Sequence, residues 1–325
     1  MNIFVTGGGG YVGSSLVPRL LDEGHKVTVY DLMIYGDDVL NTHQNLKVVK
    51  GDLRDFDLLV KSIPDHDTLI HLACISNDPS FELNPDLGKS INLDSFEPLV
   101  KIAEVSGIIR FLNASSSSVY GVKDSDNVHE EMSLEPLTDY SKYKAQCEDI
   151  LLKYNSNNFI TSTIRPATVC GYSKRQRLDV VVNIFSNIAF HKKKITVFGG
   201  DQLRPNIHIE DMVDAYLAML YASDEKISGK VFNAGDENKT VLELAQIVKE
   251  VIGPDVELIK SKTDDNRSYH ISSEKIKKEL GFSCSKTIKN AVEDLNEAFI
   301  KNKLTDPIDN EYYFNIKRMQ NLNLK

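Results

Sequence analysis

The residues best suited to catalysis in this sequence are a tyrosine and a lysine four positions apart. Tyr140 and Lys144, in the run Tyr-Ser-Lys-Tyr-Lys, would share one face of a helix. A tyrosine has a pKa of about 10 and is a weak base at neutral pH, but a nearby ammonium stabilises the phenolate and lowers that pKa. A serine run at 115–118 stands upstream and could share a substrate oxygen. Together these residue types favour the interconversion of an alcohol and a ketone, with the tyrosine as base.

A glycine-rich turn near the N-terminus predicts where a redox cofactor binds. Gly7, Gly10 and Gly13 stand between a short apolar strand and a helix. This is the context of a dinucleotide fingerprint, in which glycines allow a tight turn, close approach of phosphates and packing of the helix on the sheet. The start of the helix, at Tyr11 and Val12, then points free N–H groups at the pyrophosphate. A turn without a ligand is the alternative.

Two carboxylates follow the next strands and narrow the choice of cofactor. Asp31 ends the second strand, 18 residues after Gly13, where it would accept hydrogen bonds from the adenosine ribose and repel a 2′-phosphate. Because no arginine occurs among Leu32–Asp38, the sequence predicts NAD rather than NADP. Asp52, in the turn Gly51-Asp52-Leu53, is a candidate for the adenine amino group, with a purely structural Gly-Asp turn as the alternative.

The elements that must position these residues alternate between short apolar strands and helices of 10–15 residues. That alternation is typical of βαβ units, so we expect an α/β fold, a Rossmann doubly wound parallel sheet. After Gly171 the rhythm changes and predicts a smaller α/β C-terminal substrate lobe. The predicted NAD-binding domain comprises residues 1–171 and 207–236, and the predicted substrate lobe residues 172–206 and 237–325. Lys301–Lys325 is polar with scattered aromatics and has the weakest pattern.

The composition excludes several other classes of protein. The 325 residues carry 38 Lys and Arg against 47 Asp and Glu, and this net charge of −9 argues against nucleic acid or an anionic membrane as main partner. The four cysteines are widely spaced and predict neither disulfides nor a metal site, which favours reduced thiols in the cytoplasm. No apolar run approaches the roughly 18 residues of a membrane span, and the N-terminus lacks the basic start of a signal peptide.

Further motifs make the chain resemble the nucleotide-sugar epimerase/dehydratase family of extended short-chain dehydrogenases, which includes UDP-glucose 4-epimerases. The resemblance runs from Met1 to about Leu295. It rests on the glycine turn, Asp31, His71-Leu72-Ala73, Asn92, Ser116 to Gly121, Tyr140 with Lys144, Arg165-Pro166 before Gly171, and Arg204 to Asp211. The last segment, Arg-Pro-Asn-Ile-His-Ile-Glu-Asp, is similar to the family's Arg-Asp-Tyr-Ile-His-Val-x-Asp.

The resemblance implies roles for individual residues. Ser116, three before Val119, occupies the family's catalytic Ser/Thr position, Tyr140 would be the base, and Lys144 would orient the cofactor ribose. Arg204 and Arg267 should bind the diphosphate of the sugar nucleotide, and Arg175 and Arg177 are looser candidates. The remaining positions expected at the cofactor are Leu53, Leu72 and Ala73. His71 and His208 are expected to be structural, and a homodimer is implied through the Tyr140 helix and Leu93–Ser106.

The serine run also bears on the reaction. Relatives that dehydrate hexoses carry a Thr-Asp-Glu triplet before Val-Tyr-Gly, whereas this chain has Ser116, Ser117 and Ser118 there. We therefore expect an epimerase that oxidises a nucleoside-diphosphate sugar transiently at C4. Net oxidation or reduction at C4 in deoxysugar or heptose biosynthesis for surface polysaccharides is the alternative. A 4,6-dehydratase or a non-catalytic NAD-binding regulator is less favoured. Cys74 and Cys170 lack an adjacent histidine, so we interpret them as packing residues.

Overall fold

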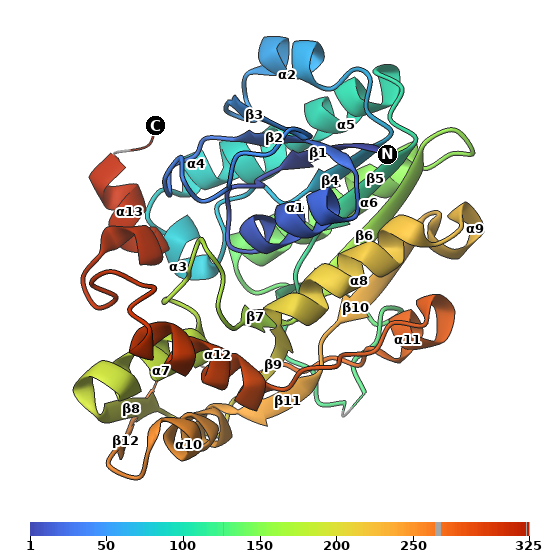
Figure 1. Cartoon of the computed structure of the whole chain (residues 1–325). Coiled ribbons are helices and arrows are strands. Elements are labelled where there is room, and N and C mark those ends of the chain that lie inside the picture. Colours follow the sequence, from blue (N-terminus) through green and yellow to red (C-terminus); the bar gives the residue numbers. More distant parts are fainter. Residues whose placement is uncertain (126, 264–267, 323, 325) are drawn as a thin grey trace.

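A seven-stranded parallel sheet forms the centre of the molecule in the computed structural model, which describes residues 1–125, 127–263, 268–322 and 324 (Figure 1). The strands in spatial order are β10 (Lys230–Ala234), β6 (Ile160–Pro166), β5 (Arg110–Ala114), β4 (Thr68–His71), β1 (Asn2–Thr6), β2 (Lys26–Asp31) and β3 (Leu46–Lys50). The central strands β1 and β4 are buried almost throughout, as expected for a sheet covered on both faces. The predicted α/β Rossmann fold is confirmed.

Helices cover both faces of this sheet. Leu16, Leu20 and Met212 belong to the core on one face, and Leu99 and Leu151 to the core on the other. The helices on the first face are α1 (Gly13–Asp22) and α8 (Ile209–Tyr221), and those on the second are α2 (Phe56–Ser62), α5 (Phe96–Val105) and α6 (Asp139–Tyr154). In the described part of the chain, no helix is long and apolar enough to cross a membrane.

The strand order reverses between β1 and β4, and this reversal creates the crevice that matters for function. The chain leaves β1 toward α1 on one face and β4 toward the other face, so the carboxyl ends of these strands separate. Ligands of open α/β sheets bind at such a point. Thr6, the last residue of β1, leads directly into the glycine turn.

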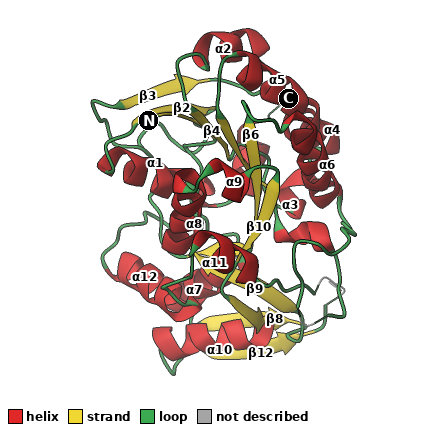
Figure 2. Ribbon diagram, turned by 90° about the vertical axis from the view of Figure 1, so that its right-hand side faces the viewer, coloured by secondary structure: helices red, strands yellow, loops and turns green. Residues whose placement is uncertain are grey.

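A second lobe continues below this crevice (Figure 2). It contains a three-stranded sheet of β11 (Glu237–Thr240), β9 (Leu203–His208) and β7 (Thr168–Cys170), and a pair of β12 (Glu257–Ser261) and β8 (Lys194–Phe198). Its own core lies among α7 (Val181–Lys192), α10 (Val241–Ile252) and α12 (Ile288–Ile300). Because β7 pairs with β9, the chain leaves the main sheet after Pro166 and returns to it with β10. The predicted domain boundaries stay a prediction.

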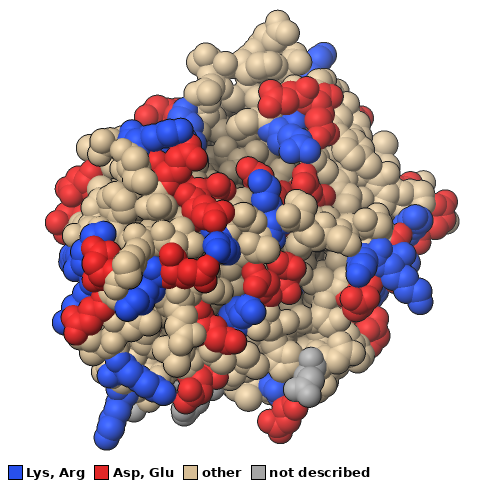
Figure 3. Space-filling model, turned by 60° about the horizontal axis from the view of Figure 1, so that its bottom comes forward, with Lys and Arg blue, Asp and Glu red and all other residues tan. Residues whose placement is uncertain are grey.

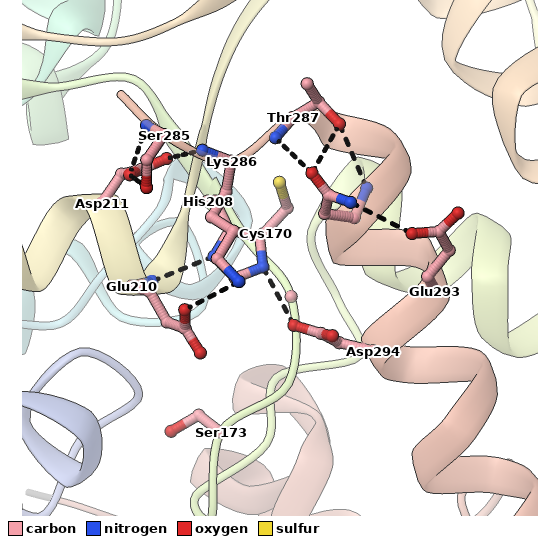
Figure 4. A network of polar contacts seen from close by, with 12 residues as sticks. Cys170, Ser173, His208, Glu210, Asp211, Ser285, Lys286, Thr287, Glu293 and Asp294 are labelled. Atoms are coloured by element: carbon pink, nitrogen blue, oxygen red, sulfur yellow. Dashed lines mark hydrogen bonds and ion pairs between the residues drawn. The ribbon is translucent and has the colours of Figure 1, made fainter. Parts of the chain in front are cut away.

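The start of α8 joins the two lobes through buried polar side chains (Figure 4). The Asp211 carboxylate accepts hydrogen bonds from the backbone N–H groups of Ser285 (2.8 Å) and Lys286 (3.0 Å). His208 caps α8 by accepting from the Glu210 N–H, and its other ring nitrogen lies 3.1 Å from the Asp294 carboxylate on α12. His208 therefore has structural contacts, as the sequence predicted.

The polar C-terminal segment returns to the first lobe. It forms η3 (Glu311–Tyr313) and α13 (Asn315–Leu322), and α13 lies beside α3 (Asp78–Phe81). Met319 joins a small core with Ile75, Phe81 and Leu87. The remaining elements are α4 (Pro85–Lys89), η1 (Ser90–Asp94), η2 (Ser117–Tyr120), α9 (Asp224–Ile227) and α11 (Glu274–Leu280).

Candidate active site

A cavity of about 360 Å³ occupies the crevice and receives residues from both lobes and from the C-terminal helix. It brings together most residues that the sequence singled out: Gly7, Gly10, Tyr11, Val12, Gly13, Asp31, Asp52, Leu53, Leu72, Ala73, Ser116, Tyr140, Lys144 and Arg175. On the face drawn in Figure 3, positive and negative side chains are interspersed.

The glycine turn has the geometry that close approach of a ligand requires. Gly7 has a φ of +75°, and a Cβ there would lie 2.5 Å from the Ala73 nitrogen. A Cβ on Gly13 would lie 2.6 Å from the Gly7 oxygen, so the helix packs tightly on the turn. Helix α1 has no side-chain cap and no acidic residue in its first turn. Its N-terminus faces the cavity and fits the pyrophosphate of a dinucleotide.

Asp31 and Asp52 line the same end of the cavity. The Asp31 carboxylate accepts hydrogen bonds from the N–H groups of Gly9 (3.0 Å) and Met33 (2.7 Å). Burial raises the pKa of Asp31, and these backbone hydrogen bonds oppose that rise. Asp52 is held by Arg54, whose Nη2 lies 2.7 Å from it, and this contact lowers the Asp52 pKa. An interaction of Asp52 with adenine stays a prediction.

Helix α6 carries Tyr140 and Lys144 to the opposite end. Thr138 caps the helix by accepting from the Ser141 N–H, which fixes its start one residue before Tyr140. Lys144 is only 6% exposed, and its Nζ donates to the Ala114 carbonyl at 2.7 Å, at the end of β5. Ser116 follows β5 directly, and its Oγ lies 2.8 Å from the Ser118 Oγ. The carboxyl end of β5 thus sets the position of the serine relative to the helix.

The surroundings of Tyr140 favour its neutral form. Burial raises the pKa of Tyr140 well above its usual value, and Cys74 and Asp78 raise that pKa further. The Arg177 guanidinium and the Ser116 hydroxyl act in the opposite direction. A base at this position needs additional positive charge nearby, which an oxidised nicotinamide would supply.

The predicted arginines divide into three cases. Arg175 and Arg177 line the cavity. Arg204 is outside the lining; its guanidinium lies 5.3 Å from the ring centroid of Tyr269, which does line it. Arg267 lies outside the described residues. Binding of a sugar nucleotide by these side chains stays a prediction.

Other lining residues were not singled out as ligands from the sequence. Tyr35 comes from the loop after β2, and Asn315, Met319 and Leu324 come from the C-terminal segment. Asp78 also lines the cavity and accepts a hydrogen bond from the Thr138 hydroxyl at 2.6 Å. The polar run Ser76-Asn77-Asp78-Pro79 follows the end of β4 and was a usable signal for Asp78. No local pattern points to Asn315.

His71 and Cys170 are buried in the core, whereas Cys74 lies at the cavity. His71 is 5% exposed, accompanies Phe96 and Phe111 in the core, and lies 2.8 Å from the Thr6 hydroxyl through Nδ1. Burial lowers the pKa of His71 to about 3, and the charge of Lys144 contributes. Cys170 is fully buried away from the cavity lining, while Cys74 lines the cavity.

Comparisons with known proteins agree with this geometry. The trifunctional UDP-glucose 4,6-dehydratase/UDP-4-keto-6-deoxy-D-glucose 3,5-epimerase/UDP-4-keto-L-rhamnose-reductase of Arabidopsis thaliana is 27% identical over 85% of this chain, which spans 44% of that protein. A UDP-glucose 4-epimerase of Corynebacterium glutamicum is 25% identical over 90% of this chain and 94% of its own length. The structure of MoeE5 with UDP-glucuronic acid and NAD matches with a TM-score of 0.81 and 25% identity, over 94% of this chain and 100% of that chain.

A sequence profile gives the family itself. The profile described as the NAD dependent epimerase/dehydratase family matches residues 3–235, which span the central sheet, the glycine turn, Tyr140 and Lys144. The uncapped helix α1, the tight glycine turn and Asp31 fit the NAD that this family uses. The chain belongs to the NAD-dependent epimerase/dehydratase family.

Proposed function

We propose that this chain is an epimerase that inverts a nucleoside-diphosphate sugar at C4 by transient oxidation. The observation that carries the proposal is the serine run at the sugar end of the cavity. Ser116, Ser117 and Ser118 all line it beside Tyr140 and Lys144, at the positions where relatives that remove water carry an acid and a base. NAD, when bound, accepts a hydride from the sugar carbon and returns it.

The chain's own residues handle the proton and the orientation of the substrate. As a phenolate, Tyr140 takes the proton of the 4-hydroxyl. It returns that proton after the 4-keto sugar has rotated in the cavity and presents its other face. The Ser116 hydroxyl donates to the same sugar oxygen and keeps it within reach of Tyr140. Lys144, anchored on the Ala114 carbonyl, holds a positive charge one helical turn from the base. A nearby cation favours the phenolate.

Dehydration is less well supported, although a relative named as a dehydratase is as similar as the epimerase. Loss of water needs a general acid and a general base close to the sugar. The described carboxylates of the cavity lining are Asp31, Asp52 and Asp78, and the first two belong to the adenosine end. Asp78 is then the single described carboxylate near Tyr140, where relatives that remove water carry two.

The test is turnover of a panel of UDP, dTDP, GDP and CDP sugars with NAD, followed by chromatography and absorbance at the NADH band. Epimerisation predicts a C4-inverted sugar without net NADH. Stoichiometric NADH would identify the alternative, a C4 dehydrogenase, and a 4-keto-6-deoxy product would identify a dehydratase. Absence of turnover with every sugar of the panel would favour a binding protein.

The matching variant is Tyr140→Phe, which removes the proton acceptor and keeps the ring. We expect kcat to fall about 10²- to 10⁴-fold, as for loss of a general base. Binding of NAD should persist. Tyr143→Phe, on the same helix and outside the cavity lining, is the control and should retain activity. Full activity in Tyr140→Phe would contradict the assignment of the base.

A further inference from the structure

The cavity contains a buried positive charge that the protein leaves incompletely paired. Arg175 is 3% exposed, and its guanidinium lies 3.5 Å from the ring centroid of Tyr35. Its Nη2 donates to the Asn315 Oδ1 at 2.5 Å. Among the described residues, its Nε and Nη1 have no hydrogen-bond partner, and neither does the buried Nη2 of Arg177.

Such an arrangement is costly without a ligand. An arginine stays charged in proteins, and burial of a charge without a paired anion is unfavourable. Buried donors without an acceptor are part of that desolvation penalty. Arg177 has its own carboxylate, Asp179, at 2.8 Å from Nε, whereas no described ion pair includes Arg175. An anion in the cavity would pair with the Arg175 charge and accept a hydrogen bond from its free N–H groups.

The position of Arg175 identifies which anion. Its backbone N–H donates to the Ser14 Oγ at 3.1 Å, and the Ser173 Oγ lies 2.7 Å from the same hydroxyl. The segment carrying Arg175 is therefore fixed against the first turn of α1, whose uncapped end faces the cavity. The guanidinium is also close enough to Asp31 for its charge to lower the Asp31 pKa. These contacts belong to the cofactor end of the cavity.

We propose that the Arg175 guanidinium binds the pyrophosphate of the dinucleotide beside the start of α1. Its free Nε–H and Nη1–H groups point away from different edges of the guanidinium plane, so each donates to its own acceptor, and hydrogen bonds from a charged donor to a phosphate oxygen are among the strong ones. The sequence assigned Arg175 to the sugar nucleotide, and the contacts above favour the cofactor instead. This proposal rests on the NAD of the family and is independent of which sugar reacts.

Asn315 is the positioning residue for this contact. Its Oδ1 also accepts from the Tyr35 hydroxyl at 2.9 Å, and its Nδ2 donates to the Ser76 Oγ at 3.0 Å. Its backbone N–H donates to the Asp179 carboxylate at 2.8 Å. With these four contacts, the first residue of α13 fixes the direction in which the guanidinium points.

The experiment is calorimetric titration of nucleotide-free protein with NAD, NADP and UDP, for wild type and Arg175→Met. If Arg175 binds the pyrophosphate, the affinities of Arg175→Met for NAD and NADP should fall by the same factor, about 10- to 100-fold. Its affinity for UDP should be unchanged. Asn315→Ala should lose a smaller factor for both dinucleotides. Lys174→Met removes an equal charge from the neighbouring exposed residue, which contacts Asn41, and should change each affinity less than twofold.

The alternative outcomes are distinct. Loss confined to UDP would assign Arg175 to the sugar nucleotide, and loss confined to NADP would assign it to a 2′-phosphate; either overturns the proposal. An unchanged NAD affinity overturns it as well. Because an unpaired charge is removed, the Tm of Arg175→Met without ligand should be no lower than that of wild type. Addition of NAD should raise the Tm of the variant less than that of wild type. If that variant does not fold, Arg175→Gln decides, since it removes the charge and keeps a polar side chain: wild-type NAD affinity there would refute the proposal.

Discussion

Tyr140 has charged neighbours of opposite sign, and each has a separate effect on the proposed base. Asp78 raises the pKa of the phenol, and Arg177 lowers it. Both side chains line the same cavity. The pH at which the enzyme becomes active should therefore be adjustable in both directions by single substitutions.

We expect Asp78→Asn and Arg177→Gln to shift the pH profile of kcat/KM in opposite directions. Activity requires the phenolate, so the rate rises as pH passes the Tyr140 pKa. Removal of the Asp78 charge stabilises the phenolate and moves the rising limb to lower pH, whereas removal of the Arg177 charge moves it to higher pH. Shifts of the same sign in both variants would show that charge on Tyr140 is not the cause.

His71 predicts how the stability of the fold depends on pH. Its folded pKa is lowered to about 3, whereas an unfolded histidine titrates near about 6.5. Between these values the unfolded chain binds a proton that the folded chain does not. This group therefore decreases stability as pH falls from about 6.5 toward about 3, by up to about 1.4 kcal/mol per pH unit.

Substitution of His71 should remove that slope. In urea unfolding between pH 4 and 6.5, the free energy of unfolding of His71→Gln should fall less steeply with decreasing pH than that of wild type. The difference between the two slopes should correspond to about one bound proton. His43→Gln, at an exposed position, is the control and should keep the wild-type slope. Parallel slopes for His71→Gln and wild type would contradict the assignment.

At the scale of elements, α6 links the proposed chemistry to the core. Tyr140 and Lys144 face the cavity, and one turn further Glu148 is buried and pairs with Arg165 on β6, with 2.6 Å between Oε2 and Nη2. Arg165 Nη1 also donates to the Tyr120 hydroxyl at 2.7 Å. The same pair therefore holds helix, strand and the turn after the serine run in one arrangement.

We expect Glu148→Gln to destabilise the protein by about 3–5 kcal/mol, because it leaves a buried guanidinium without its anion. Glu297, on α12, is exposed and pairs with Lys301, so Glu297→Gln should leave the free energy of unfolding nearly unchanged. Urea unfolding monitored by circular dichroism measures both. Equal effects of the two substitutions would exclude a special role for the buried pair.

Local sequence predicts those helices whose capping residues and apolar spacing agree. Helix α6 is such an element, because the Thr138 cap marks its start and its buried positions follow at helical spacing. Helix α12 is another, with buried positions at helical spacing after its Thr287 cap. Helix α13 is different: it buries Asn315 and Met319 against residues far away in sequence. No local pattern encodes such a contact.

At the scale of the whole molecule, the C-terminal segment completes the cavity, and its removal is testable. A chain ending at Asn310 lacks η3 and α13 but keeps every strand of the central sheet. We expect NAD to dissociate at least about tenfold faster from it, in stopped-flow fluorescence, because Asn315 and Met319 no longer cover the site. Met319→Leu keeps the covering side chain and should dissociate like wild type. An unchanged rate in the truncated chain would refute the covering role.

Some residues of the candidate site could be predicted from local motifs, and others could not. Motifs predicted the residues that line one cavity in the structure: the glycine turn, Asp31, Ser116, Tyr140 and Lys144. Tyr35 and Asn315 were not, because their positions depend on how the second lobe and the tail fold back. The predicted homodimer and cytoplasmic location stay predictions.

The returning tail also sets an order of events during synthesis. All seven strands of the central sheet have been synthesised by Ala234, so the sheet and the glycine turn can form while later residues are still being made. Asn315 is made only after the second lobe. A nascent chain can therefore meet NAD before the residues that cover the site exist, and until then the site is open and the cofactor can exchange. A proteolytic cut near Asn310 would return the finished protein to that open, exchanging condition.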